Sequence, residues 1–563
     1  MRLAIVLLVL CTAALHSQTT DWPRSPTIAP HGMVATGQPL AAQIGLDILK
    51  RGGSAMDAAI ATNAALGLME PMSCGIGGDL FALVWDATEQ KLYGLNASGR
   101  APYAATLDYF QKKGLKDIPT SGPLSWSVPG CVDGWEVLHR KWGKLQMKDV
   151  LQPTIEYAEQ GFPVSPVIAG YWRAGERLVT RNATAETNPL KSTFYPSGRA
   201  PRTGDIFKNP NLAKSYRLIA EKGRDAFYKG PISAKIVKCS QAVGGLFSQK
   251  DFDDTAASWV EPVTTTYRGY TVCAIPPPGQ GIAALQMLNT LEAYDLKKMG
   301  PGSADYWHVF LEAKKLAYAD RARYYTDPEF AKVPVKELVS KTYASSRRQL
   351  IDMNKAMTKV DHGDPKLGQS DTVYLTVVDK DRNCVSLIQS NYNGFGSGRV
   401  PNDLGFALQN RGCLFALDPA HPNKLEPHKR PFHTIIPGFV LKDNKPWFCF
   451  GCMGGDMQPQ GQVEVVVNMI DFGMNVQAAG AYPRLEHVGS ATPTGKAMAA
   501  NGGTVQAEPG IPDAILKELE RRGHVVQRVA RNGGGYQGIL IHPETGMLHG
   551  GSEPRKDGMA IGY

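Results

Sequence analysis

Ser-Asp-Thr-Val-Tyr-Leu-Thr-Val-Val-Asp, at residues 370–379, predicts a buried strand that begins at Thr372. Val373, Leu375 and Val377 fall on one face of this strand. Tyr374, Thr376 and Val378 fall on the other. This period of two is typical of a strand. A polar turn at 380–383 leads to a second apolar run from Cys384 to Ser390, so the segment predicts a hairpin. A Thr is ordinary at a strand start because β-branched side chains fit there.

Hydrophobic patterning divides the rest of the chain into a mostly helical first part and a strand-rich second part. Two helices fit 38–68 with a break at Gly52-Gly53, and helical patterns predominate over 104–330. Residues 331–369 are polar and predict a flexible approach to Thr372. His308 to Ala322 predicts an amphipathic helix with Phe310, Ala313, Leu316 and Ala317 on its apolar face. The other predicted elements are strands at 81–85, 433–442 and 447–452, a strand pair at 536–549 and a helix at 461–472. Helices first and strands later suggest stacked α and β layers.

Composition is ordinary for a globular protein. The 563 residues are 43% hydrophobic and 9% aromatic, which is ample for a core. The net charge of +9 is modest for this length, and Lys and Arg form no dense cluster. We therefore expect no nucleic-acid partner and no binding to a lipid surface.

The N-terminus predicts a signal peptide over residues 1–17. Arg2 precedes an apolar run from Leu3 to Leu15 that is too short to span a bilayer. Leu10 is too large for the small residue that precedes a lipoprotein cysteine, so lipidation is not expected. No later apolar segment has spanning length. We expect a periplasmic or secreted protein that has no membrane attachment once the signal is removed.

Eight cysteines follow the predicted signal peptide, and an even number in an exported protein permits disulfides without establishing them. Cys449-Phe450-Gly451-Cys452 has CxxC spacing but lies in an apolar predicted strand, which favours packing over redox or metal chemistry. The spacing of His421, His428 and His433 matches no zinc template. We expect no metal and no cofactor.

Short motifs, each weak alone, occur in order from about Met33 to Tyr563. Before Thr372 they are Met33-Val34-Ala35, Pro39-Leu40-Ala41-Ala42, Gly52-Gly53-Ser54-Ala55-Met56-Asp57-Ala58-Ala59, Glu70-Pro71, Ser73-Cys74-Gly75-Ile76-Gly77-Gly78, Pro276-Pro277-Pro278, Glu312-Ala313-Lys314, Ala319-Asp320-Arg321 and Asp327-Pro328. After it they are Gly454-Gly455, Pro483-Arg484 and Pro554-Arg555-Lys556-Asp557-Gly558. In order and spacing the chain resembles the gamma-glutamyltransferases, a family of N-terminal-nucleophile hydrolases.

The resemblance implies an α+β fold, the four-layer αββα sandwich of these hydrolases, and a precursor that cuts itself between Asp371 and Thr372. The Thr372 hydroxyl would attack the carbonyl of Asp371, and an acyl shift and hydrolysis would follow. The products would be a large subunit, 18–371, and a small subunit, 372–563, that together form one catalytic domain. A Thr oxygen needs a base. The freed α-amine has a reference pKa of about 7.7–8.0, which suits that role.

The resemblance also assigns roles around the nucleophile. Gly454-Gly455 would supply the oxyanion hole, where unobstructed N–H groups and a helix dipole favour negative charge. Ser390 matches a hydroxyl residue beside the nucleophile. Tyr392 takes the place of a substrate-binding Asn, and His433-Thr434 takes the place of a Ser pair that contacts the substrate carboxylate.

Two departures from the family bear on the substrate. The family's acidic pair, which holds the substrate α-amine, falls on Cys413-Leu414, and its carboxylate-binding Arg falls near Ser98, with Arg100 two positions later. Arg411 is close in sequence and offers another positive charge. A pocket with Arg and no acid suits an acyl group that bears a carboxylate but no amine, such as glutaryl, because an unpaired buried ammonium costs several kcal/mol or so.

Three functions remain open on these residues. The default by family is cleavage of gamma-glutamyl amides such as glutathione, and a glutaryl or cephalosporin-acylase-like amidase is the alternative that the pocket residues favour. The third is a processed but inactive binding protein. The expected partner is a small-molecule amide or gamma-glutamyl peptide.

Overall fold

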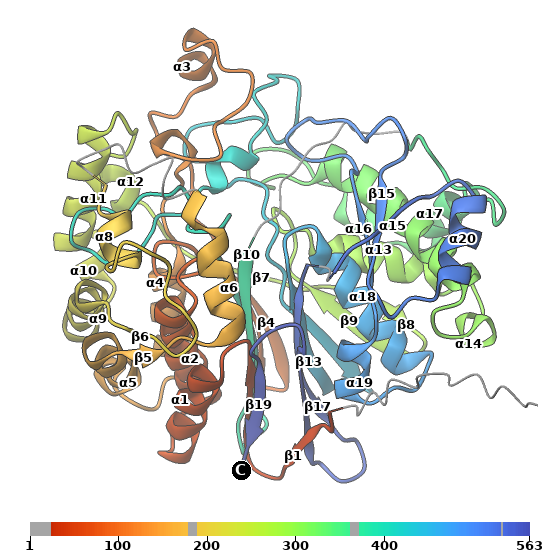
Figure 1. Cartoon of the computed structure of the whole chain (residues 1–563), viewed down its shortest axis with the longest axis horizontal. Helices are drawn as coiled ribbons and strands as arrows, with labels where there is room; N and C mark the ends of the chain where they lie inside the picture. The colour runs from red at the N-terminus through yellow and green to blue at the C-terminus, as the bar shows by residue number, and fades with distance from the viewer. Residues whose placement is uncertain (1–23, 178–187, 361–370, 531–532) are drawn as a thin grey trace, which may run out of the picture.

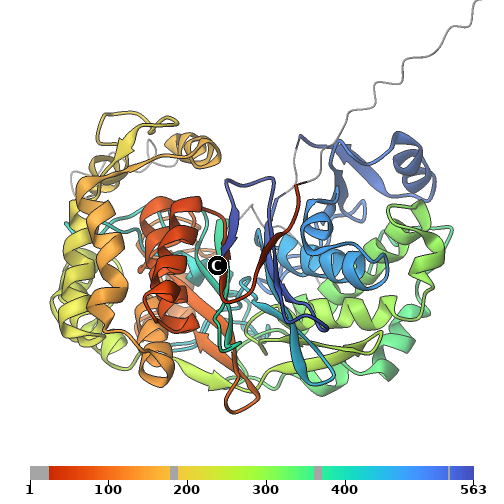
Figure 2. The same ribbon diagram turned by 90° about the horizontal axis from the view of Figure 1, so that it is seen from below.

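A computed structural model describes residues 24–177, 188–360, 371–530 and 533–563. Two seven-stranded sheets lie face to face, and helices cover the outer face of each (Figure 1). Viewed from below, the two helical layers flank the strands on opposite sides (Figure 2). The predicted α+β architecture, a four-layer αββα sandwich, is confirmed. The signal peptide predicted at 1–17 lies outside the described residues.

The first sheet contains the predicted nucleophile strand, β10, among its interior strands. Its strands, in spatial order, are β19 (Met559–Gly562), β2 (Met33–Thr36), β10 (Asp371–Val378), β11 (Cys384–Tyr392), β3 (Asp79–Asp86), β4 (Lys91–Ala97) and β7 (Ser258–Val260). β10 pairs antiparallel with β11 on one side and with β2 on the other. Strands from both sides of the predicted cut therefore belong to one sheet, and β2 lies between β19 and β10.

The second sheet is also antiparallel throughout. Its strands, in order, are β1 (Thr27–Ala29), β18 (Leu548–Ser552), β17 (Gly535–Ile541), β13 (Lys445–Met453), β12 (Gly438–Lys442), β9 (Tyr270–Ala274) and β8 (Val263–Tyr267). Two small sheets lie outside the sandwich: β14 (Leu485–Val488), β15 (Thr504–Ala507) and β16 (Val525–Arg528), and β5 (Phe162–Pro163) with β6 (Ile206–Phe207).

Tyr374 fixes how the two sheets face each other. A Cβ atom added to Gly451 of β13 would come within 2.4 Å of the Tyr374 ring, so the ring packs directly on that glycine. The Tyr374 hydroxyl is 2.7 Å from Ser386 Oγ, which donates to the carbonyl of Phe450 at 3.2 Å. Phe450 therefore lies level with Ser386 and its ladder partner Thr376, whereas Gly451 lies level with Tyr374, which is closer to the start of β10. The loop that follows β13 thus lies at the same end of the sandwich as Thr372.

The helices in contact with the first sheet are α1 (Pro39–Lys50), α2 (Ala55–Met69) and α4 (Cys131–Trp142), while α5 (Met147–Gln160) packs on α2 and α9 (Pro210–Lys222) packs on α5. Smaller helices beside them are α3 (Leu107–Lys112), η1 (Pro123–Ser125), α6 (Pro166–Ala174), α8 (Leu190–Phe194), α10 (Asp225–Tyr228), α11 (Pro231–Ala242) and α12 (Gln249–Asp253). α2 is buried along its whole length between the sheet and α5. Its small side chains allow that close approach. The predicted helix pair at 38–68 is confirmed.

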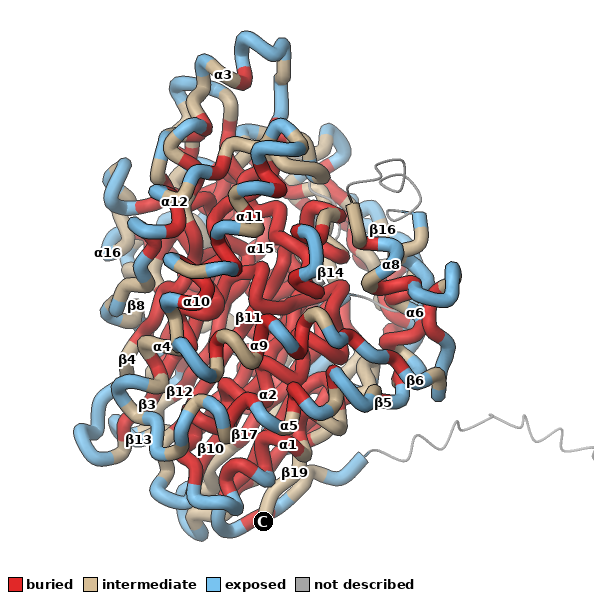
Figure 3. The backbone as a smooth tube through the Cα atoms, turned by 90° about the vertical axis from the view of Figure 1, so that its left-hand side faces the viewer, coloured by how far each residue is buried: buried red, intermediate tan, exposed pale blue. Residues whose placement is uncertain are grey.

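The helices of the other half are α13 (Gly281–Leu291), α14 (Leu296–Met299), α15 (Ala304–Tyr324), α16 (Val335–Leu338), α17 (Lys341–Arg348), α18 (Met457–Ile470), α19 (Val476–Ala481) and α20 (Asp513–Arg521), with η2 (Arg411–Leu414) in a loop. α15 is not amphipathic as predicted. It is buried on all sides because neighbours neutralise its polar residues, for example Glu312, which pairs with Lys315 at 2.8 Å. Figure 3 shows how continuous the buried interior is.

The expectation that helices predominate over 104–330 holds, and the region also contains the short strands β5, β6, β7, β8 and β9. One other expectation fails. Residues 331–360 contain α16 and α17 rather than a flexible approach. The Ser340 side chain caps the N-terminus of α17, and Ala344 is buried on the inner face of the helix. No helix of the described residues is long and apolar enough to cross a membrane.

Candidate active site

Thr372 lies beside a bulge where β10 meets β11. Asp371 pairs with Tyr392 and Val373 with Gln389, so two residues of β11, Ser390 and Asn391, oppose the single Thr372. Bulges of this kind re-aim side chains next to active sites. Thr372 is 2% exposed, and its Oγ1 donates to Ser390 Oγ at 3.3 Å. The structure thus brings the predicted nucleophile and the predicted neighbouring hydroxyl together.

The Gly75–Gly78 segment packs against the β11 side of the bulge. A Cβ atom at Gly78 would come within 2.4 Å of the Ser390 carbonyl oxygen, and one at Gly77 within 2.1 Å of the Ala407 carbonyl oxygen. Only glycine allows so close a backbone approach. Asn391 is held in turn by its backbone N–H, which donates to the Ser73 carbonyl at 3.1 Å.

Asp79 and His433 form a buried pair next to Ser390. Asp79 is opposite Ser390 in the β3–β11 ladder, and its Oδ2 accepts from His433 Nε2 at 2.9 Å. Burial, together with the positive charge of Arg411, lowers the pKa of His433 to about 3. The ring is therefore neutral at physiological pH, with its proton on Nε2, and its Nδ1 finds no donor among the described residues. His433 orients the loop that carries Thr434.

Arg411 is a fully buried cation in the same site. Its Nη1 donates to Thr434 Oγ1 at 3.1 Å, and its Nε is 4.0 Å from Asp79 Oδ2. Within the described part of the chain, Nε and Nη2 have no acceptor in hydrogen-bond range. Burial lowers the pKa of Arg411 to about 10, so the group is still charged at neutral pH. Its donors are available to an anion.

Tyr392 and the Cys413-Leu414 pair line the region around Arg411. The Arg411 guanidinium is 5.2 Å from the centre of the Tyr392 ring, and Tyr392 has an unusual positive φ of 78°. Burial, with the neighbouring Cys413 and Asp456, raises the pKa of Tyr392 well above its usual range. Leu414 is fully buried in the core of the second half, whereas Cys413 is partly exposed. Neither residue offers a carboxylate.

The predicted oxyanion loop connects β13 to α18. Gly454 and Gly455 have φ values of 116° and 57°, which favour glycine, and a Cβ atom at Gly454 would come within 2.6 Å of the Gly534 nitrogen. The carbonyl of Gly454 accepts from Met457 N at 3.0 Å, and the carbonyl of Gly455 from Gln458 N at 3.2 Å. Both carbonyls thus face the first turn of the helix.

Arg100 is engaged elsewhere. Its Nη2 donates to both carboxylate oxygens of Glu329, at 2.9 and 2.8 Å, and its Nη1 donates to the His428 carbonyl at 3.0 Å. The same pairing lowers the pKa of Glu329. The structure shows no contact between Arg100 and Arg411, Thr434 or Thr372 among the described residues. Of the two predicted cations, Arg411 is the one in contact with the other candidate residues.

Several residues of the site escaped sequence reasoning. Asp79 comes directly after the Gly75–Gly78 motif, Asp456 comes directly after Gly454-Gly455, and Arg321 ends a motif that was noted only for its order in the chain. No sequence motif marked Gln280 as part of the site. Asp79 and Asp456 each directly follow a glycine pair, and that position is the sequence signal that could have identified them.

Other clusters lie away from Thr372. The CxxC cysteines are free, because Cys449 faces the space between the sheets while Cys452 packs against Gly461 of α18. His308, Glu312 and His524 have ligand atoms within 4.8 Å of one another. Their atoms are already engaged, His308 Nδ1 with His524 Nε2 at 2.9 Å and Glu312 with the Lys315 ammonium at 2.8 Å. A metal ion would have to displace that ammonium.

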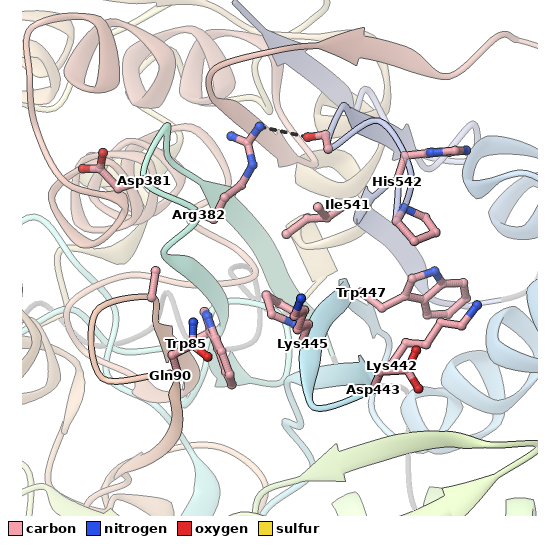
Figure 4. Close-up of a pocket in the computed structure, with 14 residues that line it drawn as sticks. Trp85, Gln90, Asp381, Arg382, Lys442, Asp443, Lys445, Trp447, Ile541 and His542 are labelled. Atoms are coloured by element: carbon pink, nitrogen blue, oxygen red, sulfur yellow. Dashed lines mark hydrogen bonds between the residues drawn. The ribbon is translucent and has the colours of Figure 1, made fainter.

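A cavity of about 570 Å³ opens at the other end of the sandwich, between the hairpin turns of the two sheets. Trp85 and Trp447 line it from facing sheets, and Arg382 reaches toward the β17–β18 turn (Figure 4). Trp85 pairs with Cys384 at the far end of the ladder from the Asp79–Ser390 pair. This cavity is therefore remote from the residues around Thr372.

Comparison with known proteins identifies relatives over almost the whole chain. The family model described as gamma-glutamyltranspeptidase matches residues 41–563. The chain is 38% identical over 537 residues to the glutathione hydrolase-like YwrD proenzyme of Bacillus subtilis (strain 168), covering 94% of this chain and 98% of the relative. It is 35% identical over 559 residues to the glutathione hydrolase proenzyme of Escherichia coli (strain K12), covering 96% and 93%.

Among solved structures, cephalosporin acylase from Bacillus halodurans matches with a TM-score of 0.88 and 43% sequence identity, covering 98% of this chain and 99% of that one. The family model and both relatives extend over almost the whole chain, and the αββα sandwich is the same. This chain belongs to the gamma-glutamyltranspeptidase family of N-terminal-nucleophile enzymes.

Proposed function

We propose that this protein is an exported, self-processing amidohydrolase in which Thr372 forms an acyl-enzyme. The Thr372 oxygen adds to the substrate amide carbonyl, the C–N bond breaks, and the amine leaves with a proton. Water then attacks the Thr372 ester and releases the carboxylic acid, which restores the hydroxyl. The contact between Thr372 and Ser390 supports this assignment, since it orients the attacking oxygen.

The Thr372 oxygen would also carry out the self-cleavage that frees the N-terminal threonine. In the uncut chain it attacks the Asp371 carbonyl, the Asp371–Thr372 C–N bond breaks, and an ester forms that water hydrolyses. A large subunit, 18–371, and a small subunit, 372–563, result. Because β10 lies between β2 and β11, the fragments remain joined through one sheet. The new α-amine is the general base, close to neutral pH in its reference pKa.

The acyl group that fits best carries a carboxylate and no amine, as in a glutaryl amide. One observation carries this choice: Arg411 is fully buried beside Thr434 with two donor groups that no described residue satisfies. An Arg can hold a carboxylate through two parallel hydrogen bonds. The relation to cephalosporin acylase adds support.

A gamma-glutamyl acyl group is the second candidate, favoured by the names of the relatives. A gamma-glutamyl group carries an α-ammonium, which needs a carboxylate partner in the pocket. Asp456 is the carboxylate next to the oxyanion loop, but Arg321 contacts both of its oxygens, at 2.7 and 3.2 Å. An ammonium would then lose hydration without gaining a full charge partner.

Parallel hydrolysis of glutaryl anilide and gamma-glutamyl anilide tests the proposal. We expect kcat/KM for the glutaryl substrate to equal or exceed that for the gamma-glutamyl substrate. A tenfold preference for gamma-glutamyl, about 1.4 kcal/mol of transition-state binding, would show that another group holds the amine. Turnover of neither anilide by the processed protein would favour the third function, an inactive binding protein.

A further inference from the structure

Arg321 connects α15 to the oxyanion loop. It is fully buried, and its guanidinium lies 3.9 Å from the centre of the Tyr318 ring. Nη1 donates to Asp456 Oδ1 at 2.7 Å and to Gln280 Oε1 at 2.5 Å, while Nη2 donates to Asp456 Oδ2 at 3.2 Å. One planar group thus fixes the side chains of Asp456 and Gln280 relative to each other.

Gln280 passes this constraint to the backbone. Its Oε1 accepts from Arg321, so its Nε2 must present both hydrogens to acceptors. These acceptors are the carbonyl oxygens of Gly455 at 2.8 Å and Thr434 at 2.7 Å. A single fully buried amide therefore holds the oxyanion loop and the loop that carries the Arg411 partner.

The peptide groups of the oxyanion loop are oriented as a result. The Gly455 carbonyl accepts from Gln280 and from the first turn of α18, and the Tyr318 hydroxyl donates to the Asp456 carbonyl. In a trans peptide the N–H points opposite to the carbonyl. The N–H groups of Gly455 and Asp456 are therefore turned away from α18, and they donate to no described backbone group.

We propose that Arg321 and Gln280 are positioning residues that preorganise the N–H groups of the Gly454–Asp456 loop for the tetrahedral intermediate. The role rests on the proposed Thr372 acyl transfer. Neither side chain touches the substrate. Preorganised donors act on the charge that develops in the transition state, so their misalignment lowers kcat more than it raises KM.

A matched pair of variants on one helix segment tests this role. Gln280→Met removes the amide with little change in volume. Gln286→Met, in α13, removes an equally buried amide whose partners are Asp320 at 2.8 Å and Tyr325 at 2.6 Å, away from the loop. Both variants should lose similar stability, measured as the melting temperature.

We expect Gln280→Met to lower kcat for the anilide substrate at least about tenfold relative to Gln286→Met, with KM changed less than about threefold. KM is protected because backbone bonds keep His433 in place, with His433 N donating to the Pro278 carbonyl at 2.9 Å and Gln280 N to the His433 carbonyl at 3.1 Å. Equal kcat in the two variants would overturn the positioning role while leaving the acyl-transfer proposal intact.

Arg321→Lys is the second variant, in case Gln280→Met does not fold. A single ammonium keeps the charge but cannot reach Gln280 and both Asp456 oxygens at once. We expect the same fall in kcat with nearly unchanged KM. A kcat within threefold of wild type in a folded Arg321→Lys protein would also overturn the role. An inactive wild-type enzyme would instead refute the acyl-transfer proposal itself.

Discussion

Thr372 Oγ1 donates a hydrogen bond to Ser390 Oγ at 3.3 Å, and the Ser390 oxygen also accepts the backbone N–H of Tyr392 at 2.8 Å. The backbone of β11 thereby fixes the oxygen that orients Thr372, the proposed nucleophile. A serine hydroxyl is too weak a base to activate a threonine. The arrangement therefore aims the Thr372 oxygen and leaves its activation to another group, for which the α-amine released by self-cleavage is suited.

The purified protein should consist of two fragments. The expected cut lies between Asp371 and Thr372, where β10 begins. N-terminal sequencing of the smaller fragment should read Thr-Val-Tyr-Leu-Thr. A stable, uncut chain that hydrolyses amides would contradict this prediction.

Thr372→Ala should block both self-cleavage and hydrolysis, because one oxygen carries out both reactions. Thr372→Ser should retain part of each, since it keeps the hydroxyl. Gel electrophoresis reports cleavage and an anilide assay reports hydrolysis. Wild-type hydrolysis in Thr372→Ala would identify a different nucleophile.

Sequence patterns predicted the layered fold well where elements are long and regular. The hairpin at Thr372 and the helix pair at 38–68 have clear periods, and the structure contains both as β10–β11 and α1–α2. The prediction failed at α15, because some of its buried charges pair with groups distant in sequence. Arg321, for example, pairs with Asp456 at 2.7 Å. No local pattern encodes such a pairing.

The site was predictable to a similar extent. Motif order singled out Thr372, Ser390, Thr434 and Gly454-Gly455. In the structure Thr372 contacts Ser390, and the Gln280 amide joins the carbonyls of Thr434 and Gly455. Motif order did not reveal that Arg100 pairs with Glu329, since the two residues are 229 positions apart in the chain and no local pattern signals that contact. Whether Arg100 or Arg411 contacts Thr434 depends on the tertiary structure, which no local pattern encodes.

Cys413→Asp should shift specificity toward gamma-glutamyl substrates. Cys413 is partly exposed and close enough to Tyr392 and Arg411 to affect their pKa values. A carboxylate there would provide the missing partner for a substrate ammonium. The ratio of kcat/KM for gamma-glutamyl to glutaryl anilide should rise about tenfold or more. Leu414→Asp is the contrasting variant: Leu414 is fully buried, so a charge should cost several kcal/mol or so of stability. An unchanged ratio in Cys413→Asp would place the amine site elsewhere.

Stability should fall in acid partly because of His524. Burial, with the charge of Lys315 next, lowers the pKa of His524 to about 2. Below about pH 6.5 the unfolded chain binds a proton that the folded chain does not, so this contribution is full above pH 6.5 and is lost as the pH falls toward 2. His524→Gln should reduce the slope of unfolding free energy against pH by up to about 1.4 kcal/mol per unit between pH 4 and 6. Urea denaturation of both proteins at several pH values measures this slope. The same slope in wild type and His524→Gln would exclude His524 as a cause of the acid instability.

Arg411→Met should remove the selectivity for a carboxylate-bearing acyl group. A bidentate, charge-assisted contact contributes roughly 2–3 kcal/mol, so kcat/KM for glutaryl anilide should fall about 30- to 100-fold or more. Pentanoyl anilide has the same chain length without the carboxylate, and its kcat/KM should be unchanged or higher. Because Arg411 is buried with two unsatisfied donor groups among the described residues, the variant should melt at the same or a higher temperature. Equal losses for both substrates, or a large fall in melting temperature, would show that Arg411 supports the fold of the site and does not bind the distal carboxylate.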